Sequence, residues 1–398
     1  MVFERGVTGL NMPARFSEVL HDFGAGNADS SVLVKAPARV NIIGEHTDYN
    51  DGFVLPMSTA IFTWAKASPR DDRKISVTSH NVGETCLFEL DGIQPGQSPS
   101  WVEYVKGVAA ELEGLGIVLR GADILIDSDI PLGAGLSSSA SLELAVAKAL
   151  LAIAGESVPG PELAKLCQRA EHRYAGVQCG IMDQYTLNCA EEGHAILLDC
   201  RSLEVLQIPM PPEFGLILTD CGVKHRLPDG HYNSRADECT TAVQILARDR
   251  PQIKSLRDLR ADVLEANQSA LGDVLYRRCR HVVSENERVK SAVQAIENGE
   301  LQKLGALFDA CHTSLRDDYE VSCDELEALV KAANASKGVF GSRMVGAGFG
   351  GCVLSVCNSD RATEVATEIR ANYATVTGEE PWQHIVEPAK PARVITQP

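Results

Sequence analysis

Residues 36–56 read APARVNIIGEHTDYNDGFVLP and place one arginine, one histidine and three acidic side chains between two apolar runs. Val40, Ile42 and Ile43 are typical of the end of a short buried strand, and the polar residues that follow form a loop closed by Gly52. Loops carried on rigid strands often hold functional residues. This segment is therefore the first candidate for a binding site.

The acidic side chains of this loop suit a ligand that carries many hydroxyl groups. Ionised carboxylates such as Glu45 and Asp48 only accept hydrogen bonds, and each can accept two from a neutral polyol. The alternative is an acidic turn in which each Asp side chain bonds to its own backbone. For any single residue that turn is the more common case, but the cluster as a whole favours a pocket that recognises a sugar.

The composition indicates a globular chain that acts on a small molecule. Its 398 residues, 44% of them hydrophobic, are enough for a substantial core in two domains. A formal net charge of −17 opposes contact with nucleic acid or an anionic membrane. The first residues do not show the basic and then apolar pattern of a signal peptide. We therefore expect a cytoplasmic protein with no nucleic-acid and no membrane partner.

The cysteines favour packing over metal binding. Twelve of them are dispersed along the chain, without a CxxC pair. Cys167, Cys352 and Cys357 fall in apolar runs, where a reduced thiol packs as a small hydrophobic group. We expect neither a disulfide framework nor a structural metal site.

Strand and helix patterns alternate along the chain, which predicts an α+β or mixed α/β fold. Strands are predicted at residues 32–35, 59–67, 75–79 and 122–128, and helices at 102–115, 139–154 and 161–176. The proline-rich IPMPPEF at 208–214 separates two strand-like runs, 195–199 and 216–220. We therefore predict an N-terminal domain at residues 1–207 and a C-terminal domain at 208–398.

A second segment, IPLGAGLSSSASLEL at residues 130–144, has the composition of a phosphate-binding loop. Gly133 and Gly135 let backbone amides approach an anion, and the following helix directs its N–H groups and dipole at the same point. Without the lysine of GxxxxGK[ST], it does not predict a Walker nucleotide fold. A serine-capped helix after a glycine turn is the structural alternative.

A third segment, VGAGFGGCVLSV at residues 345–356, places Gly346, Gly348 and Gly351 in the GxGxxG spacing of dinucleotide-binding proteins. In those proteins the glycines open a helix, whereas CVLSV is apolar and typical of a strand. We predict a glycine turn between two strands, with a backbone that can lie against a ligand. A nicotinamide oxidoreductase is therefore disfavoured.

Asp183 lies in CGIMDQY, after a glycine and two apolar residues. This context predicts a partly buried carboxylate, which needs a partner or a purpose. Near phosphates it could accept a proton or orient an attacking hydroxyl. A helix cap is the structural alternative.

Together and in this order, the segments resemble the galactokinase family of the GHMP small-molecule kinases. ARVNIIGEHTDYNDGFVLP is similar to its signature, PLGAGLSSSAS to its ATP loop, AEHRYAGVQCGIMDQY to its catalytic region and RMVGAGFGGC to its third motif. The match runs nearly from end to end. It implies the two-domain GHMP fold, with mixed sheets and helices and an active site in the cleft between the domains.

The resemblance also implies an activity, namely ATP-dependent phosphorylation of the anomeric C1 hydroxyl of galactose by an enzyme that uses Mg²⁺. We also expect this enzyme to be a monomer. Its partners would be galactose and MgATP. Asp183 would be the base or an electrostatic anchor, and Arg39 would lie beside the transferring phosphate. The sugar would contact Glu45, His46, Asp48, Gly180 and Tyr232. The ATP phosphates would contact Gly133, Ala134, Gly135, Leu136, Ser137, Ser138 and Ser139. The metal would be held by Ser139 and Glu171.

Two further alternatives stay open. The first is a related sugar 1-kinase acting on N-acetylgalactosamine or arabinose, because residues that read the C2 position are not identifiable from the sequence. The second is a non-catalytic sensor of galactose and ATP. The complete SSSAS run at 137–141 argues against the sensor, since sensors that resemble this family lack part of the loop.

Overall fold

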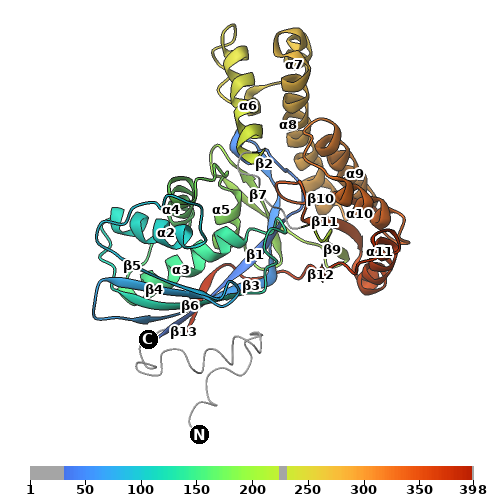
Figure 1. Ribbon diagram of the computed structural model, residues 1–398. Helices are drawn as coiled ribbons and strands as arrows, with labels where there is room; N and C mark the ends of the chain where they lie inside the picture. The colour runs from blue at the N-terminus through green and yellow to red at the C-terminus, as the bar shows by residue number, and fades with distance from the viewer. Residues whose placement is uncertain (1–30, 224–230, 397–398) are drawn as a thin grey trace.

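The computed structural model describes residues 31–223 and 231–396, and within them two β-sheets with flanking helices form a mixed α/β fold (Figure 1). The larger sheet runs β13-β1-β3-β6-β4-β5, with β2, β7 and β8 attached beside β3. Its strands are β1 (Val32–Asn41), β2 (Phe53–Val54), β3 (Pro56–Pro69), β4 (Lys74–Ser79), β5 (Glu84–Glu89), β6 (Ala122–Ser128), β7 (His194–Asp199), β8 (Val205–Pro209) and β13 (Arg393–Thr396). The smaller sheet has the order β10-β11-β9-β12. Its strands are β9 (Phe214–Asp220), β10 (Gly341–Met344), β11 (Cys352–Asn358) and β12 (Gln383–Ile385).

The helices form three groups in Figure 1. The group over one face of the larger sheet comprises α2 (Val102–Gly114), α3 (Ser138–Ala154), α4 (Gly160–Ala170) and α5 (Met182–Cys189). The projecting group comprises α6 (His231–Ala247), α7 (Ala261–Ala266) and α8 (Gln268–Glu297). The group against the smaller sheet comprises α9 (Leu301–Asp317), α10 (Asp324–Asn334) and α11 (Ala362–Thr377). In the described part of the chain, no helix is long and apolar enough to cross a membrane.

The strand that carries the signature segment is longer than predicted. The predicted strand at residues 32–35 and the apolar run at Val40 form one continuous strand, β1, and all ten of its residues are buried. It pairs with β13 on one side and β3 on the other, and α3 packs against it. A strand buried on both faces has no alternating pattern, so the sequence shows only its ends. The register with β3 shifts between Pro37 and Ala38, because proline cannot donate to the ladder.

The predicted glycine turn is confirmed. Residues 345–351 connect β10 and β11, which pair antiparallel as a hairpin in the smaller sheet.

The predicted helix at 161–176 is interrupted, because α4 ends at Ala170 and residues Glu171–Ala175 form a π-helical turn. Gly176 then ends the turn in the left-handed region, as a helix stop does.

The chain changes sheet across the proline-rich segment. The strands from β1 to β8 all belong to the larger sheet, and the next strand, β9, belongs to the smaller one. β13 then returns to the larger sheet beside β1. One cluster of buried apolar residues also continues from Val40 and Ile43 to Leu218 and Leu354. The domain division at residue 208 stays a prediction, and the two halves share a core.

A helical glycine in the C-terminal half provides a test of packing there, and a helical glycine in the N-terminal half provides its control. Gly305 in α9 lies so close to the smaller sheet that an added Cβ would be 2.3 Å from the Phe340 carbonyl oxygen, whereas Gly114 in α2 has nothing within 4 Å. We expect Gly305→Ala to lower the free energy of unfolding by about 1–3 kcal/mol. Gly114→Ala should leave it unchanged or raise it by up to about 1 kcal/mol. Urea unfolding measures both, and equal effects would contradict the close packing of α9.

Candidate active site

A cavity of about 570 Å³ brings the predicted segments together. It is lined from the N-terminal half by the loop after β1, the loop before α3, the π-helical turn and α5, and from the C-terminal half by α6 and the turn after β10. The lining residues are Arg39, Glu45, His46, Asp48, Pro99, Tyr104, Gly133, Gly135, Leu136, Ser137, Ser138, Ser139, Glu171, Ala175, Gly176, Val177, Cys179, Gly180, Met182, Asp183, Asn233, Gly346 and Ala347.

Arg39 and Asp183 form a bidentate ion pair in the lining of this cavity. Arg39 Nε donates to Asp183 Oδ1 at 2.8 Å and Nη2 donates to Oδ2 at 2.9 Å. The Arg39 side chain is 5% exposed and the Asp183 side chain 24% exposed, so the carboxylate is the more accessible partner. Burial lowers the pKa of Arg39, but the charges of Asp183 and Glu45 more than offset this effect and the pKa is raised. Arg39 therefore holds a permanent positive charge beside the carboxylate.

The serine loop is tied to the same pair. Arg39 Nη1 donates to the Gly135 carbonyl at 2.5 Å, and the Ser137 hydroxyl donates to Asp183 Oδ2 at 2.5 Å. Ser137 precedes α3 and has a φ of 63°, a left-handed conformation that turns the chain into the helix. Ser137, Ser138 and Ser139 all line the cavity at the start of α3. The positive end of the α3 dipole therefore faces the space beside Asp183.

Two glycine loops from opposite halves of the chain touch behind the serines. A Cβ on Gly135 would lie 2.8 Å from the Val345 carbonyl oxygen, and a Cβ on Gly346 would lie 2.9 Å from the Gly135 Cα. Both residues have φ values above 70°. Glycine is needed here for backbone contact as well as for conformation. The turn after β10 thus supports the serine loop instead of opening a helix.

Glu45 is held firmly by the C-terminal half. Its Oε1 accepts from Arg343 Nη1 at 3.1 Å and from the Gly346 N–H at 2.9 Å. Arg343, on β10, is fully buried and also donates to the carbonyls of Ile42 and Met344. The signature segment is therefore fixed to the smaller sheet at the rim of the cavity.

Asp48 and Gly180 lie against each other. A Cβ on Gly180 would be 2.0 Å from Asp48 Oδ2, so a larger residue would displace the carboxylate. Burial, followed by the charge of Asp183, raises the pKa of Asp48 to about 7. His46, also at the cavity, has a pKa lowered to about 3 by burial and then by His281. The loop thus presents a neutral imidazole beside a carboxyl group that titrates near neutral pH.

Glu171 belongs to a buried polar cluster at one end of the cavity. Its pKa is raised to about 7, first by burial and then by Asp183, and its carboxylate interacts with Ser139. Gln184 Nε2 donates to Glu171 Oε2 at 2.7 Å and to Glu143 Oε2 at 3.1 Å. Ser139 and Glu171 therefore offer oxygen ligands of the kind that Mg²⁺ prefers.

The structure gathers nearly all of the predicted residues. Ala134 is the exception within the described chain, because its carbonyl lies against Gly351 and it does not line the cavity. Tyr232 belongs to the first turn of α6, but its side chain lies outside the described residues. Tyr104 and Asn233 are among the lining residues that sequence reasoning missed. Tyr104 lies within an ordinary amphipathic helix and gave no signal, whereas Asn233 adjoins the predicted Tyr232.

Family models match three parts of the chain. They describe the galactokinase galactose-binding signature at residues 21–69, the GHMP kinases N terminal domain at 103–190 and the GHMP kinases C terminal region at 292–375. A mevalonate kinase structure, 17% identical, has the same fold with a TM-score of 0.65 over 90% of this chain and 99% of its own. The fold and the cavity therefore define a small-molecule kinase of the GHMP class.

Relatives with higher sequence identity show which family within this class the chain belongs to. A galactokinase of Chloroflexus aggregans is 46% identical over 346 residues, 87% of this chain and 89% of its own length. A human galactokinase is 40% identical over 361 residues, 88% of this chain and 89% of its own. The crystal structure of Lactococcus lactis galactokinase complexed with galactose is 35% identical, with a TM-score of 0.90 over 95% of this chain and 99% of that one. The chain belongs to the galactokinase family.

The raised pKa of Asp48 predicts a pH-dependent stability. Folded Asp48 keeps its proton up to about pH 7, whereas an unfolded Asp loses it near pH 4. Between these values the folded state binds more protons, so the contribution of Asp48 to stability falls as pH rises. We expect Asp48→Asn to gain on the order of 2 kcal/mol relative to the original protein between pH 5 and pH 8.

Urea unfolding at several pH values measures this gain, with Asp237→Asn, at an exposed position on α6, as the control. A difference between Asp48→Asn and the original protein that stays constant with pH would contradict the assignment.

Proposed function

We propose that this protein transfers the γ-phosphoryl group of ATP to the anomeric C1 hydroxyl of galactose, which gives galactose 1-phosphate and ADP. Membership of the galactokinase family supports the reaction, and the galactose bound by the Lactococcus lactis relative supports the sugar. The observation that carries the proposal is the convergence of Arg39, Asp183 and Ser137 between the signature loop and the start of α3.

Asp183 Oδ1 is the atom proposed to accept a hydrogen bond from the sugar hydroxyl. Its partner Oδ2 already accepts from Arg39 and Ser137, whereas Oδ1 accepts from Arg39 Nε. A carboxylate oxygen has two lone pairs, so Oδ1 can take a second donor. A hydroxyl hydrogen-bonded there is oriented for attack and can lose its proton as the bond to phosphorus forms.

Arg39 would stabilise the charge that develops on the transferring group. It is buried, permanently charged and locked by three hydrogen bonds to Asp183 and Gly135. Preorganised cations in a site that excludes water stabilise phosphoryl transfer without rearranging during the reaction. The N–H groups of Ser137, Ser138 and Ser139 would bind the ATP phosphates at the start of α3.

The acidic loop would read the sugar. Glu45 and Asp48 provide carboxyl oxygens that can accept hydrogen bonds, and His46 provides a neutral ring beside them. Gly180 leaves room for Asp48 and would allow the sugar to approach the backbone. Tyr232 is proposed to contact the sugar on the strength of the family resemblance alone.

Ser139 and Glu171 fit a Mg²⁺ ion. Both are oxygen donors, and a cation would offset the buried charge of Glu171, whose pKa is raised to about 7 by burial and by Asp183. The described residues contain no group of three or more His, Cys, Asp or Glu side chains that could hold a metal. The ATP phosphates would therefore supply further ligands, and the bound ion would neutralise their charge.

A cytoplasmic, monomeric enzyme is part of the proposal. All twelve cysteines are free thiols in the structure, which suits a reducing compartment. In the described residues, the exposed large hydrophobic side chains are spread along the chain from Val82 to Trp382, as is usual for a monomer.

A coupled assay of ADP release tests the substrate and the metal together. We expect turnover with galactose and MgCl₂, at least about tenfold lower kcat/KM with N-acetylgalactosamine, arabinose or glucose, and loss of turnover in excess EDTA. A preference for N-acetylgalactosamine or arabinose would move the assignment to a related sugar 1-kinase. Binding of galactose and ATP without ADP release would support the sensor.

Asp183→Asn tests the proposed catalytic carboxylate. The amide keeps the shape but cannot accept a proton, so we expect kcat to fall by about 10²–10⁴-fold. Equilibrium binding of galactose and of ATP, measured by calorimetry, should change little. A variant with the original kcat would remove Asp183 from the mechanism, and a variant that binds neither ligand would indicate misfolding.

A further inference from the structure

Behind the cavity, a closed ring of hydrogen bonds begins and ends at His46. Its Nδ1 lies 2.8 Å from the Tyr49 hydroxyl, which lies 2.8 Å from the Tyr319 hydroxyl. The Tyr319 hydroxyl lies 3.2 Å from Cys239 Sγ, and Asn50 Nδ2 donates to that sulfur at 3.6 Å. Asn50 Nδ2 also donates to the His46 carbonyl at 2.9 Å, which closes the ring. His46 is therefore contacted through both its side chain and its backbone.

The chemistry of the partners gives this ring a direction. The Ala347 carbonyl can only accept, so His46 Nε2, 3.2 Å away, carries the hydrogen. Burial lowers the pKa of His46 to about 3, so its imidazole is neutral and Nδ1 is an acceptor. Tyr49 then donates to Nδ1, and its oxygen accepts from Tyr319. By the same logic, Tyr319 accepts from the Cys239 thiol.

Tyr319 also packs between two histidines that serve the signature loop. Its ring centroid lies 4.7 Å from that of His46 and 4.6 Å from that of His281. His281 Nε2 lies 3.0 Å from the Glu45 carbonyl, to which it donates. Tyr319 is fully buried, so a change in its position would be transmitted to both neighbouring residues of the loop, Glu45 and His46.

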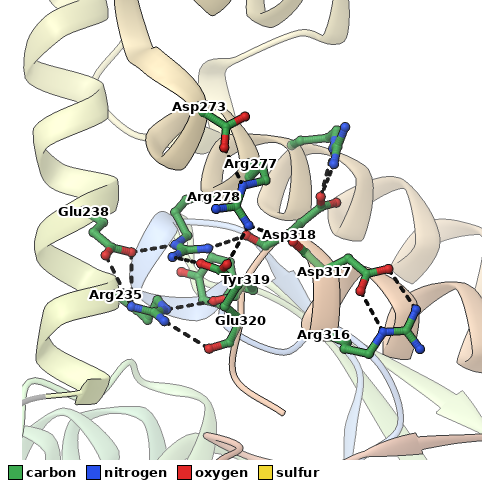
Figure 2. Close-up of polar contacts among 11 residues, drawn as sticks. Arg235, Glu238, Asp273, Arg277, Arg278, Arg316, Asp317, Asp318, Tyr319 and Glu320 are labelled. Atoms are coloured by element: carbon green, nitrogen blue, oxygen red, sulfur yellow. Dashed lines mark hydrogen bonds and ion pairs between the residues drawn. The ribbon is translucent and has the colours of Figure 1, made fainter. Parts of the chain in front are cut away.

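An arginine cluster fixes the backbone that carries Tyr319 (Figure 2). Arg235 Nε donates to the Tyr319 carbonyl at 2.8 Å, and Arg278 Nη1 donates to the Asp318 carbonyl at 2.5 Å. Arg278 also pairs with Glu238 and Glu320, each at 2.6 Å. Arg235 and Glu238 lie on α6 and Arg278 on α8. The segment after α9 is thus held by α6 and α8, with its tyrosine directed at the signature loop.

We propose that Tyr49 and Tyr319 are positioning residues for sugar binding. Through the ring they hold the His46 imidazole in position, with its Nε2 hydrogen directed at the Ala347 carbonyl, and they stabilise a left-handed backbone conformation with a φ of 62°. Residues other than glycine rarely adopt that conformation, so it depends on contacts such as those from Asn50 and Tyr49. The proposal rests on the proposed function, because it assigns His46 to the sugar.

The tautomer can be measured without substrate. In protein labelled with ¹⁵N-histidine, long-range ¹H–¹⁵N correlation spectra should show His46 with a hydrogen on Nε2 and a bare Nδ1. The resonance is assigned by its loss in His46→Gln. Tyr49→Phe removes the donor to Nδ1 and should shift the Nδ1 resonance, while the hydrogen stays on Nε2 because the Ala347 carbonyl still accepts from it. A hydrogen on Nδ1 in the original protein would contradict the donor and acceptor roles assigned to the hydrogen bonds of the ring.

Kinetics separate positioning from general stability. Tyr319→Phe and Tyr49→Phe keep the rings but remove one hydroxyl each, so we expect the KM for galactose to rise about fivefold, as for one neutral hydrogen bond. The KM for ATP should change less than about twofold. Tyr373→Phe is the matched control, because its buried hydroxyl donates to the Cys221 carbonyl outside the ring. It should alter neither KM.

The outcomes distinguish this inference from the proposed function. An unchanged KM for galactose in both ring variants would overturn the inference while the original protein still phosphorylates galactose. Equal increases in both KM values, with a lower melting temperature, would also overturn it, because the tyrosines would then support the fold generally. If the original protein does not phosphorylate galactose, the proposed function fails and the tautomer measurement still tests the ring.

Discussion

The buried ion pair between Arg343 and Glu45 is the interaction on which the arrangement of the cavity depends. Arg343 comes from the smaller sheet and is fully buried, and Glu45 follows the strand that carries Arg39. Removing one partner of such a pair typically costs about 3–5 kcal/mol, because the other charge is left uncompensated. The guanidinium also binds backbone carbonyls on both sides of the junction. The two halves of the chain therefore share one electrostatic anchor, which aligns the strand that carries Arg39.

Beyond this ion pair, close contacts at glycine positions determine how the loops of the site lie against one another. Gly135 and Gly346 press two loops together, and Gly180 admits the carboxylate of Asp48. These contacts place the serine loop, the acidic loop and Asp183 around one space. Substitutions at such glycines would alter the geometry of several segments at once, so the family motifs describe a shape as well as a set of ligands.

Local patterns in the sequence predicted the local structure well. The strand at Ala122–Ser128 and the hairpin after Met344 followed from apolar, β-branched runs and from glycines that open no helix. The length of β1 could not be predicted, because burial on both faces erases its alternation. Arg343 was not anticipated either. It pairs with Glu45 across 298 positions, and a contact between such distant residues leaves no periodic trace.

The return of β13 to the larger sheet has a consequence for biosynthesis. Until β13 is made, β1 has an unpaired edge, although it already carries the arginine that pairs with Asp183. Exposed, flat and apolar edges invite pairing with other chains. The nascent protein would therefore have this edge of β1 open to pairing with other chains until residues 393–396 are made. Protection of that edge would come only once β13 has left the ribosome.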